Sequence, residues 1–191
     1  GNALDRGAIE KILKDFEGLV VVDEAYCDFS SQKPFRTELS KYPNIVVLNT
    51  MSKAWGSAGI RLGMAFASKD IIDILNKVKY PYNVNALTQR EALELLADPY
   101  EVDKWVRTIL LERSRVVDAI KVLPICRKVY PTDANFVLVE VDDARKTYDY
   151  LVDRGIIVRN RNSVHLWNGC LRITIGTKTE NQELLAALRT M

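Results

Sequence analysis

The sequence predicts an α/β fold in which short buried strands alternate with amphipathic helices. Solid apolar runs at residues 19–22, 45–48 and 62–67 indicate the strands. The segments between and after these runs carry apolar residues at helical spacing, which indicates the helices. With 191 residues, of which 48% are hydrophobic, the chain can bury a real core as one large domain or two small ones.

The strands expected in the first part of the chain end in polar residues. The first should be buried on both faces and stops at Asp23 and Glu24, and the second stops at Asn49 and Thr50. After the third strand, Ser68 can cap the next helix. The helices expected here cover residues 8–18, a segment with Ile71, Ile72, Leu75 and Val78 on its apolar face, and residues 86–97.

A long helix should follow, because Asp98, Pro99 and Glu101 combine a cap, a proline at the first position and a glutamate three residues after the cap. We place the domain boundary within this helix and expect domains at residues 1–108 and 109–191. The second domain is typical of a smaller α+β unit, whose last helix is entered through a capping box. Its strands should cover residues 126–130, 136–141, 156–159 and 171–175, and its helices residues 144–154 and 179–189.

The composition excludes several classes of protein. Lys and Arg number 27 against 25 Asp and Glu, for a formal net charge of +2, so no nucleic-acid or acidic-membrane partner is expected. The apolar runs are too short to span a bilayer. Cys27, Cys126 and Cys170 have no close spacing, which argues against a disulfide framework or a zinc site. We therefore expect a soluble, cytoplasmic protein without a bound metal.

Two polar clusters follow buried strands, where open α/β sheets bind ligands. The first cluster, D-E-A-Y, contains Asp23 and Tyr26, and the second, T-M-S-K, contains Lys53 and precedes Arg61. A lone acidic residue after a strand is usually a loop residue or a helix cap, and a lone lysine is usually solvated. The joint occurrence of the two clusters, each after its own strand, is much less common.

This set matches the chemical needs of pyridoxal 5'-phosphate (PLP). A lysine forms a Schiff base with the aldehyde, and for this its amine must be partly neutral. A sheltered site beside a cationic ring lowers the pKa of the amine and so favours the neutral form. A carboxylate at the pyridine nitrogen keeps the ring protonated, so that the ring can stabilise a substrate carbanion. A phenol near the ring oxygen tunes the imine, while hydroxyl groups and an arginine suit the phosphate.

The chain resembles the fold-type I aminotransferases, and among them most closely the histidinol-phosphate aminotransferase family. The resemblance runs through essentially the whole chain in the right order. The block from Lys53 to Arg61 is specific for the superfamily. The matching segments are D-E-A-Y at 23–26, T-M-S-K-A-W-G-S-A-G-I-R-L-G at 50–63, P-Y-N-V-N at 81–85, A-N-F at 134–136, V-R-N-R at 158–161 and C-L-R-I-T-I-G at 170–176.

The resemblance implies a fold and a set of roles. The fold is part of a PLP-dependent large domain, a mostly parallel sheet with flanking helices, followed by a small α+β domain. Lys53 would be the catalytic lysine that bonds to the cofactor and carries the proton. The other implied cofactor contacts are Asp23 at the pyridinium nitrogen, Tyr26 at the ring oxygen, and Thr50, Ser52 and Arg61 at the phosphate. The implied substrate contacts are Arg172, Arg159 and Asn135.

The implied reaction is transamination between L-histidinol phosphate and 2-oxoglutarate, giving imidazole acetol phosphate and glutamate, in a homodimer. Family members are nearly twice as long, so we expect this chain to match their C-terminal portion and to lack part of the active site. Three alternatives stay open: another PLP enzyme such as an aromatic aminotransferase or threonine-phosphate decarboxylase, a catalytically silent module, and a nucleotide-binding protein. The last is disfavoured because the chain has no phosphate-loop motif.

Simpler interpretations exist for single residues. Asp23 can be a cap, and Arg172 can be a structural strand arginine paired with a carboxylate. The adjacent Arg161 can take the role given to Arg159.

Overall fold

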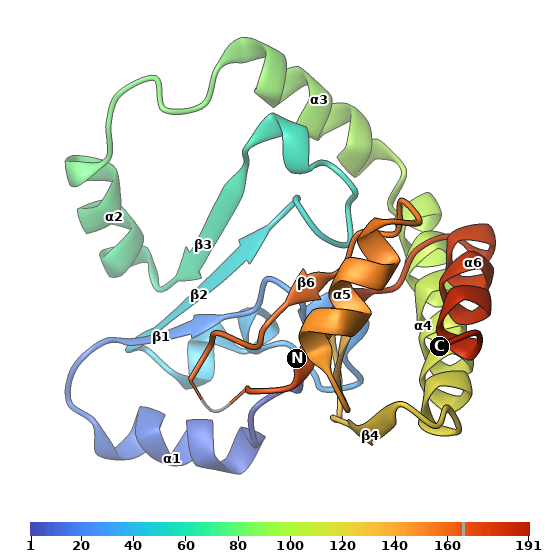
Figure 1. Cartoon of the computed structure of the whole chain (residues 1–191). Helices are drawn as coiled ribbons and strands as arrows, with labels where there is room; N and C mark the ends of the chain where they lie inside the picture. The colour runs from blue at the N-terminus through green and yellow to red at the C-terminus, as the bar shows by residue number, and fades with distance from the viewer. Residues whose placement is uncertain (166) are drawn as a thin grey trace. The chain divides into compact units, whose positions relative to one another are not determined.

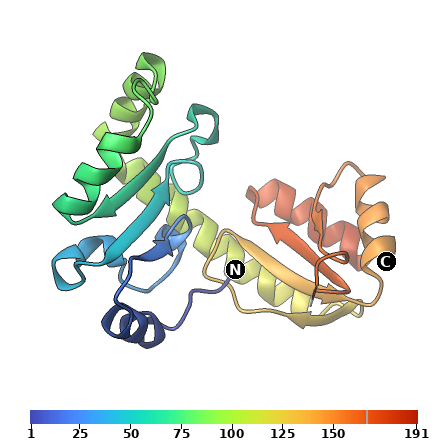
Figure 2. The same ribbon diagram turned by 90° about the vertical axis from the view of Figure 1, so that its left-hand side faces the viewer.

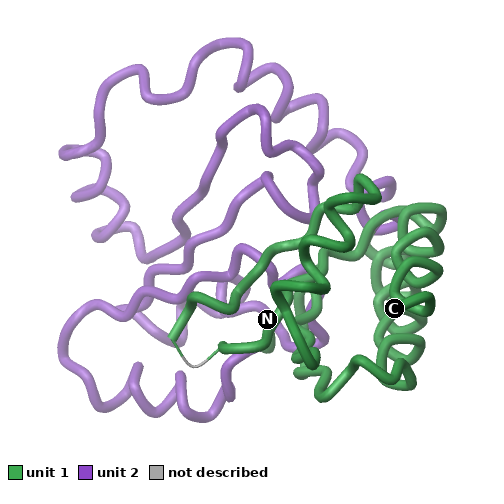
Figure 3. The backbone as a smooth tube through the Cα atoms, in the orientation of Figure 1, with its two compact units in different colours: residues 1–2, 106–191 green, residues 3–105 purple. Residues whose placement is uncertain are grey.

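The computed structural model describes residues 1–165 and 167–191, and the chain divides into two compact units (Figure 3). Unit 2 comprises Ala3–Trp105, and unit 1 comprises Gly1–Asn2 together with Val106–Met191. The long helix α4 (Pro99–Lys121) contributes residues to both units. No helix among the described residues is long and apolar enough to cross a membrane.

Unit 2 is built on a three-stranded sheet in the order β1 (Val20–Asp23), β2 (Ile45–Thr50) and β3 (Gly63–Ala67) (Figure 1). β1 and β2 run parallel, whereas β3 is antiparallel to β2. Figure 2 shows the same three strands from the side. The parallel pair brings the ends of β1 and β2 to one edge of the sheet, which places the two polar clusters together.

Helices and short turns of unit 2 surround this sheet. The helix α1 (Arg6–Asp15) begins at Asp5, whose carboxylate accepts the backbone N–H of Ala8 at 2.8 Å. Four buried side chains join α1, the following loops and β2 in one cluster: Leu13, Phe35, Ile45 and Val47. The other helices are α2 (Lys69–Val78) and α3 (Ala86–Ala97), and the 3₁₀ turns are η1 (Cys27–Phe29), η2 (Phe35–Thr37), η3 (Leu39–Lys41) and η4 (Ala58–Ile60).

Two expectations for unit 2 were wrong. The first strand is not buried on both faces, because Val21 is 59% exposed while its neighbours in β1 turn toward the α1 side of the sheet. Ser68 precedes α2 but makes no capping hydrogen bond, and none of the α2 side chains is fully buried. Of the residues expected on the apolar face of α2, Val78 is 73% exposed. Apolar periodicity therefore marked the helix correctly but overstated how much of it is covered.

Unit 1 is built on a four-stranded antiparallel sheet and three helices. The strand order is β4 (Cys126–Val129), β5 (Phe136–Val141), β7 (Cys170–Thr174) and β6 (Arg159–Asn160). The helices are α4, α5 (Ala144–Val152) and α6 (Lys178–Arg189) (Figure 1). Their apolar faces form one core with the inward side chains of β5 and β7.

Local sequence signals explain most of this unit. Residues of β5 alternate between half-buried and buried, as expected for a strand covered on one face. The capping box at the start of α6 is confirmed, since Thr177 and Glu180 exchange the two reciprocal hydrogen bonds. The strand expected at 156–159 was placed wrongly, because only Arg159 and Asn160 pair with β7.

Candidate functional site

The first part of the candidate site lies where β1 and β2 end in unit 2. The backbone N–H of Glu24 bonds to the carbonyl of Leu48 at 2.8 Å, which extends the ladder between the strands by one residue. Tyr26 then lies in the loop after β1, and Lys53 lies three residues after the end of β2. The two clusters that the sequence separates by more than twenty residues therefore leave the sheet side by side.

Lys53 and Tyr26 are brought into contact. The Lys53 Nζ lies 5.3 Å from the centroid of the Tyr26 ring, and both side chains are half-buried. A tight turn after the lysine is closed by a 3.0 Å hydrogen bond from the Gly56 N–H to the Lys53 carbonyl. Gly56 has a φ of 65°, a conformation that favours glycine. The predicted catalytic amine and the predicted ring-oxygen partner thus share one site.

Asp23 ends β1 on the open side of the sheet. It is the register partner of Leu48, which is 39% exposed, so the two side chains share that face. Its Oδ1 accepts the backbone N–H of Ala25 at 2.9 Å, which closes a turn after β1 and does not cap a helix, since Tyr26 is the residue that precedes η1. The second oxygen, Oδ2, has no hydrogen bond within the described residues, so the carboxylate can cap the turn and still present an oxygen to a ligand.

The predicted phosphate contacts come from adjoining segments. The hydroxyls of Thr50 and Ser52 lie 2.9 Å apart and form a hydrogen-bonded pair at the end of β2. Thr50 is also the register partner of Gly63, which places the preceding residues, including Arg61, beside this strand end. Arg61 is exposed, and its Nη1 donates to the carbonyl of Ala58 at 3.0 Å.

The backbone of Arg61 is strained, with φ 55° and ψ 41° in the left-handed region. Such a conformation costs a non-glycine residue roughly 1–2 kcal/mol. The turn is held from α3, where the buried Thr88 donates its hydroxyl to the carbonyl of Ile60 at 3.1 Å. An arginine held in a conformation better suited to glycine is typical of a functional position.

The second part of the candidate site lies in unit 1. Arg159 and Arg172 are register partners on β6 and β7, so their side chains stand on the same face of the sheet. Neither forms an ion pair within the described residues, and the Nε of Arg172 is buried without a hydrogen-bond partner there. The carboxylate partner that a purely structural Arg172 would need is therefore not observed. Two facing cations repel each other unless an anion lies between them.

Arg172 lies on the face of β7 opposite the core, beside an aromatic ring. Leu171 and Ile173 point into the core on the opposite face, as the alternation of the strand predicts. The guanidinium carbon lies 4.9 Å from the centroid of the Phe136 ring. Asn135 precedes β5, and its backbone carbonyl accepts the N–H of Ile175 at 2.9 Å, while its side chain forms no hydrogen bond within the described residues.

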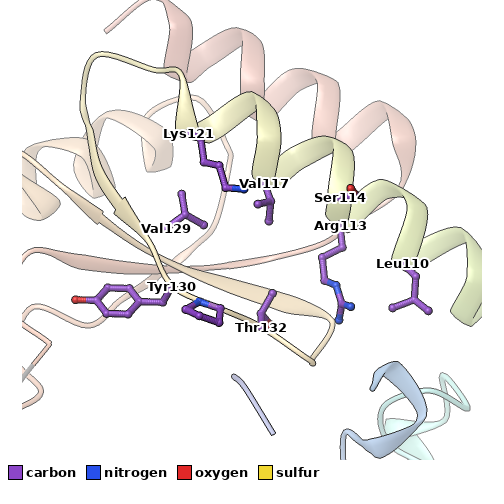
Figure 4. Close-up of a pocket in the computed structure, with 9 residues that line it drawn as sticks. Leu110, Arg113, Ser114, Val117, Lys121, Val129, Tyr130 and Thr132 are labelled. Atoms are coloured by element: carbon purple, nitrogen blue, oxygen red, sulfur yellow. The ribbon is translucent and has the colours of Figure 1, made fainter. Parts of the chain in front are cut away.

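Unit 1 also has a cavity of about 380 Å³ between α4 and residues 129–132 (Figure 4). None of the predicted site residues lines it. Its cationic groups are already engaged, because Arg113 donates to the carbonyl of Ala134 at 2.8 Å and Lys121 pairs with Asp118 at 3.3 Å. Burial lowers the pKa of Arg113 from its ordinary value. This cavity offers no convergent set of free polar groups and is not the candidate site.

Sequence reasoning missed a polar network beneath the β1 and β2 ends. Glu24 and Asn49 are 8% and 7% exposed, and both are hydrogen-bonded. Cys27, whose thiol pKa is raised by burial, accepts from Asn49 and from Arg36. The signal was available, since an asparagine inside an apolar strand needs buried partners.

Comparisons with known proteins agree with this geometry. The family model described as aminotransferase class I and II matches residues 1–188. The chain belongs to this aminotransferase family. The histidinol-phosphate aminotransferase of Parabacteroides distasonis is 58% identical over 191 residues, which is all of this chain and 55% of that protein. The chain thus spans about half the length of the curated relatives it matches.

Solved structures of aminotransferases share the fold. The crystal structure of histidinol-phosphate aminotransferase from Clostridium acetobutylicum has a TM-score of 0.90 at 23% identity, covering 98% of this chain and 59% of that one. The Sinorhizobium meliloti histidinol-phosphate aminotransferase, solved in complex with pyridoxal-5'-phosphate, has a TM-score of 0.76 at 28% identity, covering 90% of this chain and 48% of that one. The family implies PLP, and the amine, phenol, carboxylate and hydroxyl groups at the strand ends are the donors and acceptors that this cofactor requires.

Proposed function

We propose that this chain supplies the lysine site and the anion-binding strand of a PLP-dependent aminotransferase that acts on L-histidinol phosphate. The observation that carries the proposal is the contact of Lys53 with Tyr26 beside the Thr50–Ser52 hydroxyl pair. The names of the curated relatives support the substrate. We also propose a cytoplasmic homodimer, in keeping with the family resemblance, with a cofactor domain at residues 1–108 and a small domain at residues 109–191.

Each predicted site residue of unit 2 has a role in this proposal. Bound PLP supplies an electron sink for the bonds at the substrate carbon. Lys53 binds the cofactor and then moves the proton, because its amine is the basic group beside the Tyr26 ring. Asp23 would hold the ring nitrogen of the cofactor, and the hydroxyls of Thr50 and Ser52, together with Arg61, would bind its phosphate.

Unit 1 supplies the recognition of the substrate anion. Arg172 and Arg159 face each other and pair with no carboxylate of the described residues, which suits the doubly charged phosphate of histidinol phosphate. Asn135 has a side-chain amide available for a further polar contact. Transfer of the amino group to 2-oxoglutarate would give imidazole acetol phosphate and glutamate.

Trapping of the cofactor lysine tests the first step. The chain is mixed with PLP, reduced with borohydride and digested, and the modified lysines are identified by mass spectrometry. We expect a visible absorbance band before reduction and an adduct concentrated at Lys53. The variant Lys53→Ala should lose both signals, whereas the control Lys69→Ala should keep both, because Lys69 is exposed and pairs only with Asp73 at 2.5 Å. An adduct spread evenly over surface lysines would contradict the assignment.

A substrate panel tests the reaction. It uses a protein that carries this chain within the full length of its relatives, with histidinol phosphate, phosphate-free aromatic amino acids and threonine phosphate as donors. We expect histidinol phosphate to give a higher kcat/KM than the aromatic amino acids, because two paired arginines suit a doubly charged phosphate better than a singly charged carboxylate. Higher activity with aromatic amino acids or release of carbon dioxide from threonine phosphate would assign the chain to one of those related PLP enzymes.

A further inference from the structure

The contact between Lys53 and Tyr26 joins two loops that follow different strands. Nothing in the covalent chain keeps these loops in register, since the two residues are separated by more than twenty positions. The backbone ladder ties the strands only as far as the bond from Glu24 to Leu48, so the turn that carries Tyr26 needs side-chain interactions to fix it against the end of β2. The inference below rests on the proposed function, because it explains how that site keeps its geometry.

Asn49 lies at this junction. It is the last residue but one of β2, and its side chain turns to the same side of the sheet as Val47, away from Leu48. It is 7% exposed. A buried primary amide is costly unless its donors and acceptor are all used, so its partners show what it holds.

The amide of Asn49 bonds to the turn after β1 and to the last residue of β2. Its Nδ2 donates to the carbonyl of Glu24 at 3.2 Å and to the Sγ of Cys27 at 3.4 Å, one residue on either side of Ala25 and Tyr26. Its Oδ1 accepts the backbone N–H of Thr50 at 2.6 Å. The Asn49 side chain thus links the turn that carries Tyr26 to the end of β2, which leads to Lys53.

A second set of contacts holds the turn after β1 against η2. The Glu24 carboxylate accepts the backbone N–H of Phe35 at 2.5 Å and lies 3.4 Å from Nη1 of Arg36. Arg36 also pairs with Asp28 at 3.0 Å. These contacts hold the turn against η2, but none of them reaches β2. Asn49 is therefore the side chain that links this turn to the lysine loop.

We propose that Asn49 is a positioning residue that sets the placement of Tyr26 relative to Lys53. It touches neither the proposed cofactor nor the substrate, and it acts through the backbone of both loops. Loss of its amide leaves each loop folded and keeps the backbone bond from Glu24 to Leu48, but it removes the side-chain link between the turn after β1 and the end of β2. The consequence is a weaker and less ordered lysine site rather than an unfolded unit.

The chain contains a matched control on the same strand. Asn44 precedes β2 at its other end, and its Nδ2 donates to the carbonyls of Leu13, Phe16 and Gly18 at 3.1, 3.2 and 3.2 Å. It ties the end of α1 and the loop before β1 to the residue that precedes β2, at the opposite end of the strand from the polar clusters. Removal of either amide should cost similar stability, so only Asn49 should affect the site.

The test compares Asn49→Ala and the similarly sized Asn49→Leu with Asn44→Ala. The first measurement is amide hydrogen exchange of the chain without cofactor. We expect exchange at residues 24–28 and at Thr50 to become about tenfold faster in both Asn49 variants, the size expected for losing one net hydrogen bond, and to stay unchanged in Asn44→Ala. The second measurement is the fraction of borohydride-trapped PLP found at Lys53, together with the visible band, which should fall only in the Asn49 variants.

Unchanged exchange in both loops of Asn49→Leu, or equal loss of the Lys53 adduct in Asn44→Ala, overturns the inference. If Asn49→Ala unfolds, the leucine variant decides the matter, because it fills the same space without hydrogen bonds. Failure of the unmutated chain to label at Lys53 would count against the proposed function alone, since the exchange comparison does not use PLP.

Discussion

Helices pack against one face of the sheet in each unit, but the opposite faces differ, and in unit 2 that face still buries Val46 to 7% exposure. In unit 1, β5 alternates strictly, and Val137, Val139 and Val141 are at most 5% exposed while the residues between them are half-buried. In unit 2, the apolar run of β1 continues onto the open face, where Val21 is 59% exposed. The same face of β2 shows Leu48 at 39%.

The difference in exposure corresponds to two strand patterns that can be told apart in the sequence. An alternating strand suits a sheet with one solvated face, whereas a solid apolar run suits burial on both faces. The open face of unit 2 is also the face to which Asp23 and Thr50 belong. In unit 1 the corresponding face carries Arg159 and Arg172. In both units the predicted site residues lie on the face opposite these helices, and in unit 2 this face also carries exposed apolar side chains.

The difference between the two sheets can be tested by truncating one apolar residue in each and comparing the loss of unfolding free energy. Leu171→Ala removes a fully buried side chain from unit 1 and should cost about 2–5 kcal/mol of unfolding free energy. Val21→Ala in unit 2 should stay within about 0.5 kcal/mol, because most of the side chain is already in water. Urea unfolding followed by amide NMR signals of each unit measures both effects. A cost at Val21 as large as that at Leu171 would show that the open face is covered in solution.

Acid should affect unit 2 through one carboxylate. Hydrogen bonds from Lys41 and Lys33 lower the pKa of Glu38 from 4.5 to about 2, and Arg6 contacts the same carboxylate. A group whose pKa is lower in the folded state stabilises the fold above its unfolded pKa. This contribution is therefore present above pH 4.5 and is lost as the pH falls toward 2. Glu38→Gln should lower the melting temperature of unit 2 at pH 7 and have little effect at pH 2.

The matching acid-sensitive carboxylate in unit 1 is Glu112. Hydrogen bonds from Arg115 and Asn181 lower its pKa from the ordinary value. Glu112→Gln is the control for the pH experiment, because its effect should appear in the signals of unit 1. An equal loss of stability in the signals of both units with Glu38→Gln would contradict the assignment of this pH effect to unit 2.

The smallest effect on stability is expected at Arg172. Arg172→Leu removes one of two facing cations, so the unfolding free energy should change by no more than about 0.5 kcal/mol or rise slightly. The same change should weaken binding of inorganic phosphate to unit 1, followed by NMR titration. Ile173→Ala is the control for this experiment. Because Ile173 is 2% exposed, its truncation should lower the unfolding free energy, but it removes no charge from the arginine pair. Phosphate binding that is unchanged in Arg172→Leu would exclude the arginine pair as the anion site.

Much of the fold was predictable because the signals are local. The helix at 86–97 and the strand at 136–141 have the boundaries that their apolar patterns predict, and the capping box at Thr177 is present. The segment at 156–159 failed because a strand needs a partner, and pairing to β7 begins only at Arg159. Ser68 failed as a cap because its side chain does not bond to the first turn of α2.

The sequence alone determined the kinds of groups in the candidate site, since Asp23, Lys53 and Arg61 are predicted from the chemistry that PLP requires. Tertiary structure decided which of these groups meet. The Lys53–Tyr26 contact depends on parallel pairing of β1 with β2 and on the bonds made by Asn49, and the facing of Arg159 and Arg172 depends on the register of β6 with β7. The physical reason is that hydropathy and capping act between neighbours in the chain, whereas register and buried hydrogen bonds join residues that the chain itself keeps apart.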